Sequence, residues 1–143
     1  MKHQTLDHLQ AIADVKLEAP TPKMTRTQRI KRWAELLEAQ PARCLGMFVG
    51  TEYLLPQARQ IARAAGSPIT VAFEDPLLRA AGLQNDTYGE AKRFFELADW
   101  QLHDIVCSCH AGTTTKGKSA AATVRRVLSG RRFLVWLRYV LIH

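Results

Sequence analysis

Apolar residues recur at helical spacing along most of this chain. The stripe is clearest in residues 25–38, where apolar side chains fall at i, i+3, i+4 and i+7. These four residues are Ile30, Trp33, Ala34 and Leu37. Thr25 followed by Gln28 fits a capping box, which predicts where this helix begins. Pro41 predicts that the helix ends before it.

Shorter helices are predicted from start and stop signals. Capping residues or first-turn prolines mark the expected starts, and glycines follow several of the expected ends. The predicted starts are Thr5, Pro56, Asp75-Pro76, Asn85-Asp86-Thr87, Asp99 and Ser119. The helix from Asp99 is expected to run to Gly112. The helix capped by Ser119 is expected to bury one face, formed by Ala122, Val124, Val127 and Leu128.

Two segments predict strands rather than helices. Residues 69–73 alternate and are β-branched, and residues 47–49 form a short apolar run closed by Gly50. If both form, they are expected to pair; a buried extended segment packed on helices is the alternative. The predicted fold class is therefore mainly α, a compact helical domain of five to seven short helices with at most a small two-stranded element.

Three regions are predicted along the chain. Residues 1–24 form an N-terminal arm whose linker contains Pro20 and Pro22, since closely spaced prolines end a helix. Residues 25–110 form the helical core domain. Residues 111–143 form a basic arm with an apolar end.

The charge of the chain is concentrated at its C-terminal end. Basic and acidic residues balance over residues 1–110, so the whole excess of +7 lies in residues 111–143, which contain no acid. This asymmetry predicts an anionic macromolecule as partner, with nucleic acid favoured and a membrane surface as the variant. Improved solubility is the plain alternative. The predicted nucleic-acid or anion-binding residues are Lys116, Lys118, Ser119, Arg125, Arg126, Arg131 and Arg132.

Composition narrows the class of protein. Of the 143 residues, 47% are hydrophobic and 23% are charged, which is typical of a globular chain and argues against disorder. Three cysteines are too few for a disulfide scaffold. The first residues are polar and carry no secretory signal, so we expect a cytoplasmic protein.

A histidine and cysteine pattern suggests a second function. His103, Cys107 and His110 are spaced i, i+4 and i+7, so a regular helix would align them on one stripe. Imidazole and thiolate bind transition metals such as zinc. Cys44, His3 or His8 would have to complete the site. The alternatives are half-exposed histidines beside buried cysteines, or a Cys–His catalytic pair that lacks an orienting carboxylate.

One string matches a phosphate-binding loop letter by letter. Gly112, four residues, then Gly117, Lys118 and Ser119 satisfy the pattern G-x-x-x-x-G-K-S. The pattern needs a preceding strand and a downstream acid that holds magnesium, and residues 120–143 contain no acid. We therefore expect no nucleotide hydrolysis. Simple anion binding at the start of the following helix is the preferred interpretation.

The last segment is mostly apolar and is interrupted by basic residues. Residues 133–142 could pack in the core, lie at a membrane interface, or join two copies into a homo-oligomer. The sequence thus predicts a small non-enzymatic helical protein that binds an anionic partner through its basic C-terminal arm. A metal-binding or redox module is the alternative.

Overall fold

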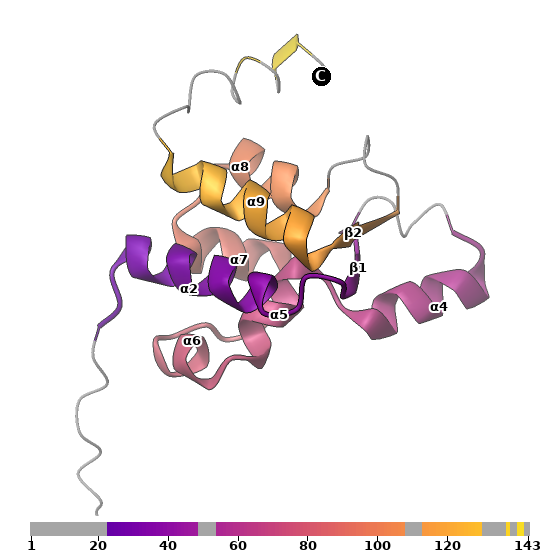
Figure 1. Cartoon of the computed structure of the whole chain (residues 1–143), viewed down its shortest axis with the longest axis horizontal. Helices are drawn as coiled ribbons and strands as arrows, with labels where there is room; N and C mark the ends of the chain where they lie inside the picture. Colours follow the sequence, from indigo (N-terminus) through magenta and orange to yellow (C-terminus); the bar gives the residue numbers. More distant parts are fainter. Residues whose placement is uncertain (1–22, 49–53, 108–112, 130–136, 138–139, 142–143) are drawn as a thin grey trace, which may run out of the picture.

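The computed structural model describes residues 23–48, 54–107, 113–129, 137, 140 and 141. The fold is mainly helical, with a small two-stranded antiparallel sheet, which confirms the predicted fold class (Figure 1). In chain order the elements are α2 (Arg26–Glu38), β1 (Cys44–Gly46), α4 (Pro56–Ala65), α5 (Pro68–Glu74), α6 (Pro76–Ala80), α7 (Tyr88–Phe95), α8 (Asp99–Val106), β2 (Thr114–Lys116) and α9 (Gly117–Leu128). The predicted N-terminal helix and most of the arm lie outside the described residues.

Helix α2 forms as its sequence predicts. The Thr25 hydroxyl accepts the Gln28 N–H at 3.2 Å, and the Thr25 N–H donates to the Gln28 side chain at 2.8 Å. This reciprocal pair satisfies two amides that the first turn leaves without helical partners. All four residues of the predicted apolar stripe are fully buried. Helix α2 therefore presents a continuous apolar face to the rest of the fold.

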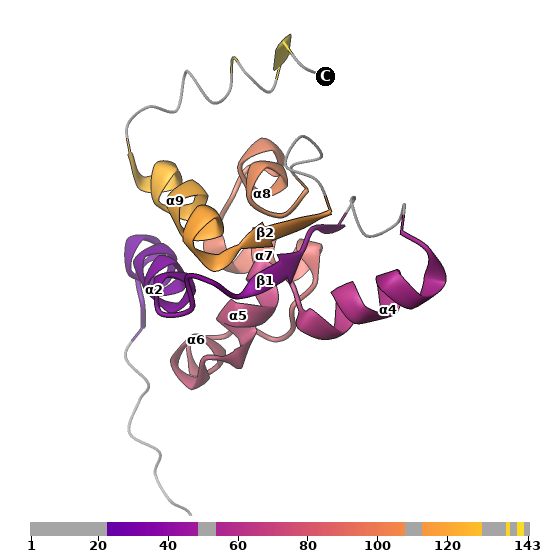
Figure 2. The same cartoon turned by 45° about the vertical axis from the view of Figure 1, so that its right-hand side comes forward.

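The core extends further along the chain than the sequence predicts. We expected it to end at residue 110, but α9 packs along α2, and the two helices lie side by side (Figures 1 and 2). The face of α9 that joins the core cluster consists of Ala120, Ala121, Val124 and Val127. Small and β-branched side chains on this face let the two helices approach closely. Helix α9 is thus part of the core rather than of an arm.

The strand predicted at residues 69–73 is wrong, because this segment forms helix α5. The Ser67 hydroxyl accepts the Ile69 and Thr70 N–H groups, and the Ser67 N–H donates to the Thr70 hydroxyl at 2.9 Å. Pro68 then occupies the first turn, where its fixed φ suits a helix. Capping and burial of Ile69, Val71 and Ala72 outweigh the preference of β-branched residues for strands.

The sheet instead joins segments far apart in the sequence. Strand β1 pairs antiparallel with β2, with Cys44 opposite Lys116 and Gly46 opposite Thr114. The predicted strand at residues 47–49 was therefore placed too late, and its predicted partner was wrong. One further backbone bond extends the ladder, since the Met47 N–H donates to the Thr113 carbonyl at 3.0 Å. The Gly46 N–H instead donates to the Gly66 carbonyl at 2.8 Å, which joins β1 to the end of α4.

The remaining boundaries follow local signals only in part. Pro56, Asp75 and Thr87 mark helix starts as expected. Ala98, not Asp99, takes the N-cap position of helix α8. The helix begins at Asp99 and ends at Val106, well before the predicted end near Gly112. Helix α9 begins at Gly117, so Ser119 is not its cap. Among the helices described, none is both long enough and apolar enough to cross a bilayer.

A buried ion pair links α2 to the start of α6. The Asp75 carboxylate, which is 5% exposed, accepts Arg32 Nε at 3.1 Å and Nη2 at 2.9 Å. It also caps α6 by accepting the Leu78 N–H at 3.2 Å. The hydrogen bonds from Arg32, with the attraction of its charge, hold the pKa of Asp75 below its ordinary value. Ionised Asp75 therefore stabilises the fold above its unfolded pKa of about 4, and this contribution is lost as pH falls through the folded pKa.

The substitution Asp75→Asn is expected to cost about 2 kcal/mol of unfolding free energy at pH 7, since it leaves Arg32 without its partner. Urea unfolding at pH 7 and pH 3 measures the loss, which should shrink at the lower pH because Asp75 of the unfolded chain is then protonated and the wild-type fold loses part of its advantage. Glu35→Gln, at an exposed acid that attracts Arg32 without forming an ion pair with it, is the control and should cost much less than Asp75→Asn. An equal loss for Asp75→Asn at both pH values would contradict the ionic role.

Candidate functional site

The predicted basic site begins at the junction of β2 and α9. Lys116 ends β2 opposite Cys44, and Lys118 and Ser119 lie in the first turn of α9. All three side chains are exposed. Neither Lys116 nor Lys118 forms an ion pair with an acid in the described part of the chain. The junction therefore presents two uncompensated positive charges to solvent.

The phosphate-loop resemblance has a structural explanation. Residues 114–116 form a strand rather than a loop, and α9 follows directly, without a loop that could surround a phosphate. The Gly117 N–H donates to the Arg43 carbonyl at 2.9 Å, and the Lys118 N–H donates to the Pro41 carbonyl at 3.1 Å. Two of the first amides of α9 are thus already paired with backbone carbonyls, which leaves fewer N–H donors for an anion at this helix start.

Close backbone contact explains the glycine of this string. A Cβ at position 117 would lie 2.1 Å from the Gln40 carbonyl oxygen and 2.8 Å from that of Leu37. Gly117 itself is buried against the turn that follows α2. The residue type is therefore required for packing α9 on α2, and phosphate binding is not needed to explain it.

Two predicted anion-binding arginines are paired within the protein. Arg125 binds the Glu38 carboxylate through Nε and Nη2, the latter at 2.6 Å, across α9 and α2. These hydrogen bonds, with the Arg125 charge, lower the pKa of Glu38. Arg126 lies 3.7 Å from an Asp104 oxygen on α8. Arg131 and Arg132 lie outside the described residues. Local pairing thus concentrates the accessible charge of the described C-terminal part on Lys116 and Lys118.

Of the predicted metal-binding residues, only His103 lies within α8. His103 is half-buried on α8, whereas Cys107 is buried and lies at the helix end with φ −123° and ψ 6°. His110 lies outside the described residues. The helix that would have aligned them ends at Val106. Within the described ranges, no group of three His, Cys, Asp or Glu side chains is placed to hold a metal. The metal site stays a prediction, which elemental analysis of the purified protein tests.

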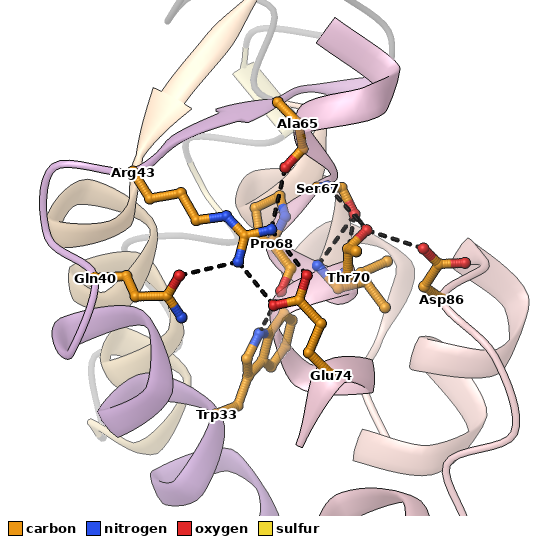
Figure 3. A network of polar contacts seen from close by, with 10 residues as sticks. Trp33, Gln40, Arg43, Ala65, Ser67, Pro68, Thr70, Glu74 and Asp86 are labelled. Atoms are coloured by element: carbon orange, nitrogen blue, oxygen red, sulfur yellow. Dashed lines mark hydrogen bonds and ion pairs between the residues drawn. The ribbon is translucent and has the colours of Figure 1, made fainter. Parts of the chain in front are cut away.

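A polar network fixes the turn that supports the junction (Figure 3). Arg43 forms two hydrogen bonds to Glu74, at 2.7 and 2.9 Å, and one to the Ala65 carbonyl at 3.2 Å. It also binds the Gln40 side chain at 3.0 Å. The hydrogen bonds from Arg43, with its charge, lower the pKa of Glu74. Arg43 therefore ties the start of β1 to the ends of α4 and α5, while its carbonyl holds the start of α9.

A cavity of about 380 Å³ lies next to this network. Its walls come from the end of β1, the α4–α5 connection and the start of α7. Ser67, Thr70 and Asp86 form a hydrogen-bonded row along it (Figure 3). Sequence reasoning missed this site because these residues come from separate segments. The capping residues at 67 and 87 gave the only local signal, and that signal concerns helix starts.

Comparison with protein-family models, with curated proteins and with solved structures finds no match.

Proposed function

We propose that this protein binds nucleic acid through the basic surface that begins at Lys116 and Lys118 and continues into the acid-free C-terminal residues. The observation that carries the proposal is the exposure of these two lysines at the β2–α9 junction, without an acidic partner among the described residues. Phosphate groups are the anions that such lysines meet along a nucleic acid, and neutralising them releases counterions. Arg131, Arg132 and Arg138 would extend the same surface along the chain.

In the free protein the two arginines of α9 are paired with acids, Arg125 with Glu38 and Arg126 with Asp104. Because Arg125 and Glu38 both lie at the surface, solvent and salt weaken their attraction, and a phosphate can compete for the guanidinium. Binding would then recruit charges that the free protein pairs internally. Acids that lie on α2 and α8 thus moderate the affinity of a surface formed by α9.

Salt-dependent binding tests the proposal. Fluorescence anisotropy with labelled duplex DNA and single-stranded RNA should show affinity falling steeply between about 50 and 200 mM salt. The double variant Lys116→Gln/Lys118→Gln should reduce the log–log slope on duplex DNA by about 2. Glu38→Gln should raise affinity, since it removes the acid that pairs with Arg125.

The matched control is Lys23→Gln/Lys31→Gln, which removes two exposed lysines before and within the first half of α2. The control should change the slope less than the junction variant does. A flat salt response, or equal effects of the two double variants, would overturn the assignment. Flotation with anionic vesicles provides the other comparison: vesicle binding without nucleic-acid binding would show a membrane surface as the partner instead.

A further inference from the structure

The cavity beside the Arg43 network has the size and lining of a small-molecule site. Its volume of about 380 Å³ falls in the range of ligand pockets, roughly 300–1,000 Å³. One wall is apolar and is formed by Met47, Phe48 and Ala62. Another part of the lining is the polar row of Ser67, Thr70 and Asp86. The site is separate from the basic junction and does not depend on nucleic-acid binding.

The hydroxyl groups that line the cavity already form hydrogen bonds within the protein. Thr70 donates its proton to Asp86 Oδ2 at 2.9 Å, so the 3.3 Å contact between Ser67 and Thr70 places the Ser67 proton on Thr70. The Thr87 hydroxyl donates to Asn85 at 2.6 Å. The Tyr88 hydroxyl donates to the Asp99 carbonyl at 3.1 Å. A ligand therefore meets few free hydroxyl donors or acceptors here.

Asp86 is the group that remains available. Its Oδ2 accepts from Thr70, whereas its Oδ1 accepts no hydrogen bond from any described residue. Asp86 also forms no ion pair within the described part of the chain. A neutral ligand filling the cavity would remove water from this carboxylate without replacing its charge partner, which is unfavourable. A cationic donor would compensate the charge with a strong hydrogen bond.

Two aromatic rings in the cavity also favour a ligand that carries an ammonium group. Phe48 and Tyr88 both line the cavity, with their rings edge to face at 6.5 Å between centroids. Aromatic faces attract ammonium groups and also accept apolar bodies. We propose that this cavity binds a small molecule in which an ammonium group is attached to an apolar or aromatic body, with Asp86 as its counter-ion.

Arg63 distinguishes two sources of this chemistry. Its side chain is exposed and lines the cavity, so it adds a positive charge near the ligand. An amino acid would offer a carboxylate to Arg63 and its ammonium group to Asp86. A simple amine would lack that carboxylate and would have no group for Arg63 to bind. Both kinds of ligand would place an ammonium group at Asp86. A substitution of Arg63 therefore distinguishes an amino acid from a simple amine.

Isothermal titration of the full chain with matched probes tests the proposal. 2-Phenylethylamine and phenylalanine carry the ammonium group, whereas 2-phenylethanol and 3-phenylpropanoate do not. At least one ammonium probe should bind about tenfold or more tightly than the alcohol, a difference of about 1.4 kcal/mol. Arg63→Gln should weaken the binding of phenylalanine if the ligand is an amino acid, and should leave the binding of the amine unchanged.

Asp86→Asn is the decisive variant. It keeps an oxygen for the Thr70 hydroxyl but removes the charge, so it should abolish the preference for ammonium over alcohol. Asp104→Asn, which removes a half-buried carboxylate outside the cavity, should leave that preference intact. Equal binding of amine and alcohol by the wild-type protein would overturn the proposal, as would the absence of ammonium binding at millimolar concentration. The wild-type series decides this even if the Asp86 variant fails to fold.

Discussion

Gly117→Ala is expected to destabilise the fold by about 3 kcal/mol or more, although alanine is the better helix former. The added methyl group would lie 2.1 Å from the Gln40 carbonyl oxygen, a backbone atom that cannot rotate away. Relief requires α9 to move from α2, which would break the bond from the Gly117 N–H to Arg43 and disturb the sheet register at Lys116. Chemical denaturation followed by circular dichroism measures the loss.

Gly89→Ala is the matched control, because the same substitution there meets open space. A Cβ at position 89 has no atom within 4 Å, and the residue lies within α7. This variant should be more stable than wild type by about 0.5–1 kcal/mol. A neutral Gly117→Ala would show that the close approach of α9 to the turn after α2 is not required.

Trp33→Ala is expected to cost about 3–5 kcal/mol, the range for removing a large aromatic side chain from a core. Trp33 is fully buried and stacks on Phe95 with ring centroids 4.4 Å apart and planes inclined by 18°. Its indole N–H also donates to the Pro68 carbonyl at 2.8 Å, which joins α2 to the start of α5. The substitution leaves a cavity at the centre of the helical packing and removes that bond.

Two further tryptophan variants separate these contributions. Trp33→Phe keeps an aromatic ring but removes the N–H donor, so we expect a loss of about 1–2 kcal/mol. Trp100→Ala, at a half-exposed tryptophan on α8, should cost less than Trp33→Ala. Urea unfolding curves compare the three variants. Similar losses for Trp33→Ala and Trp100→Ala would contradict the central position of Trp33.

Features encoded within a few residues were predictable from the sequence. The capping box of Thr25 and Gln28, and the apolar stripe that follows, define α2 because both depend on helical spacing alone. Asp75 before Pro76 likewise marks the start of α6. In each case the local hydrogen bonds and the buried face favour the same structure.

Features decided by distant residues were not predictable in this way. The segment after Ser67 has strand-forming residues, yet its cap and its place in the core make it helical. The charge count of residues 111–143 gave no hint that Arg125 meets Glu38 and Arg126 meets Asp104. The glycine of the Gly-Lys-Ser string is required by the Gln40 carbonyl, which lies in the turn after α2. The cavity, too, exists only because three segments converge.

The pairing of α2 with α9 has a consequence for how the chain is made. Contacts such as that between Glu38 and Arg125 span 87 residues. The apolar face of α2 therefore leaves the ribosome long before α9, which packs against it, has been synthesised. Contacts between residues so far apart in the sequence slow folding and leave aggregation-prone apolar surface exposed during synthesis. A nascent chain stalled before α9 should therefore depend on chaperones, and the native structure should form only after translation has passed that helix.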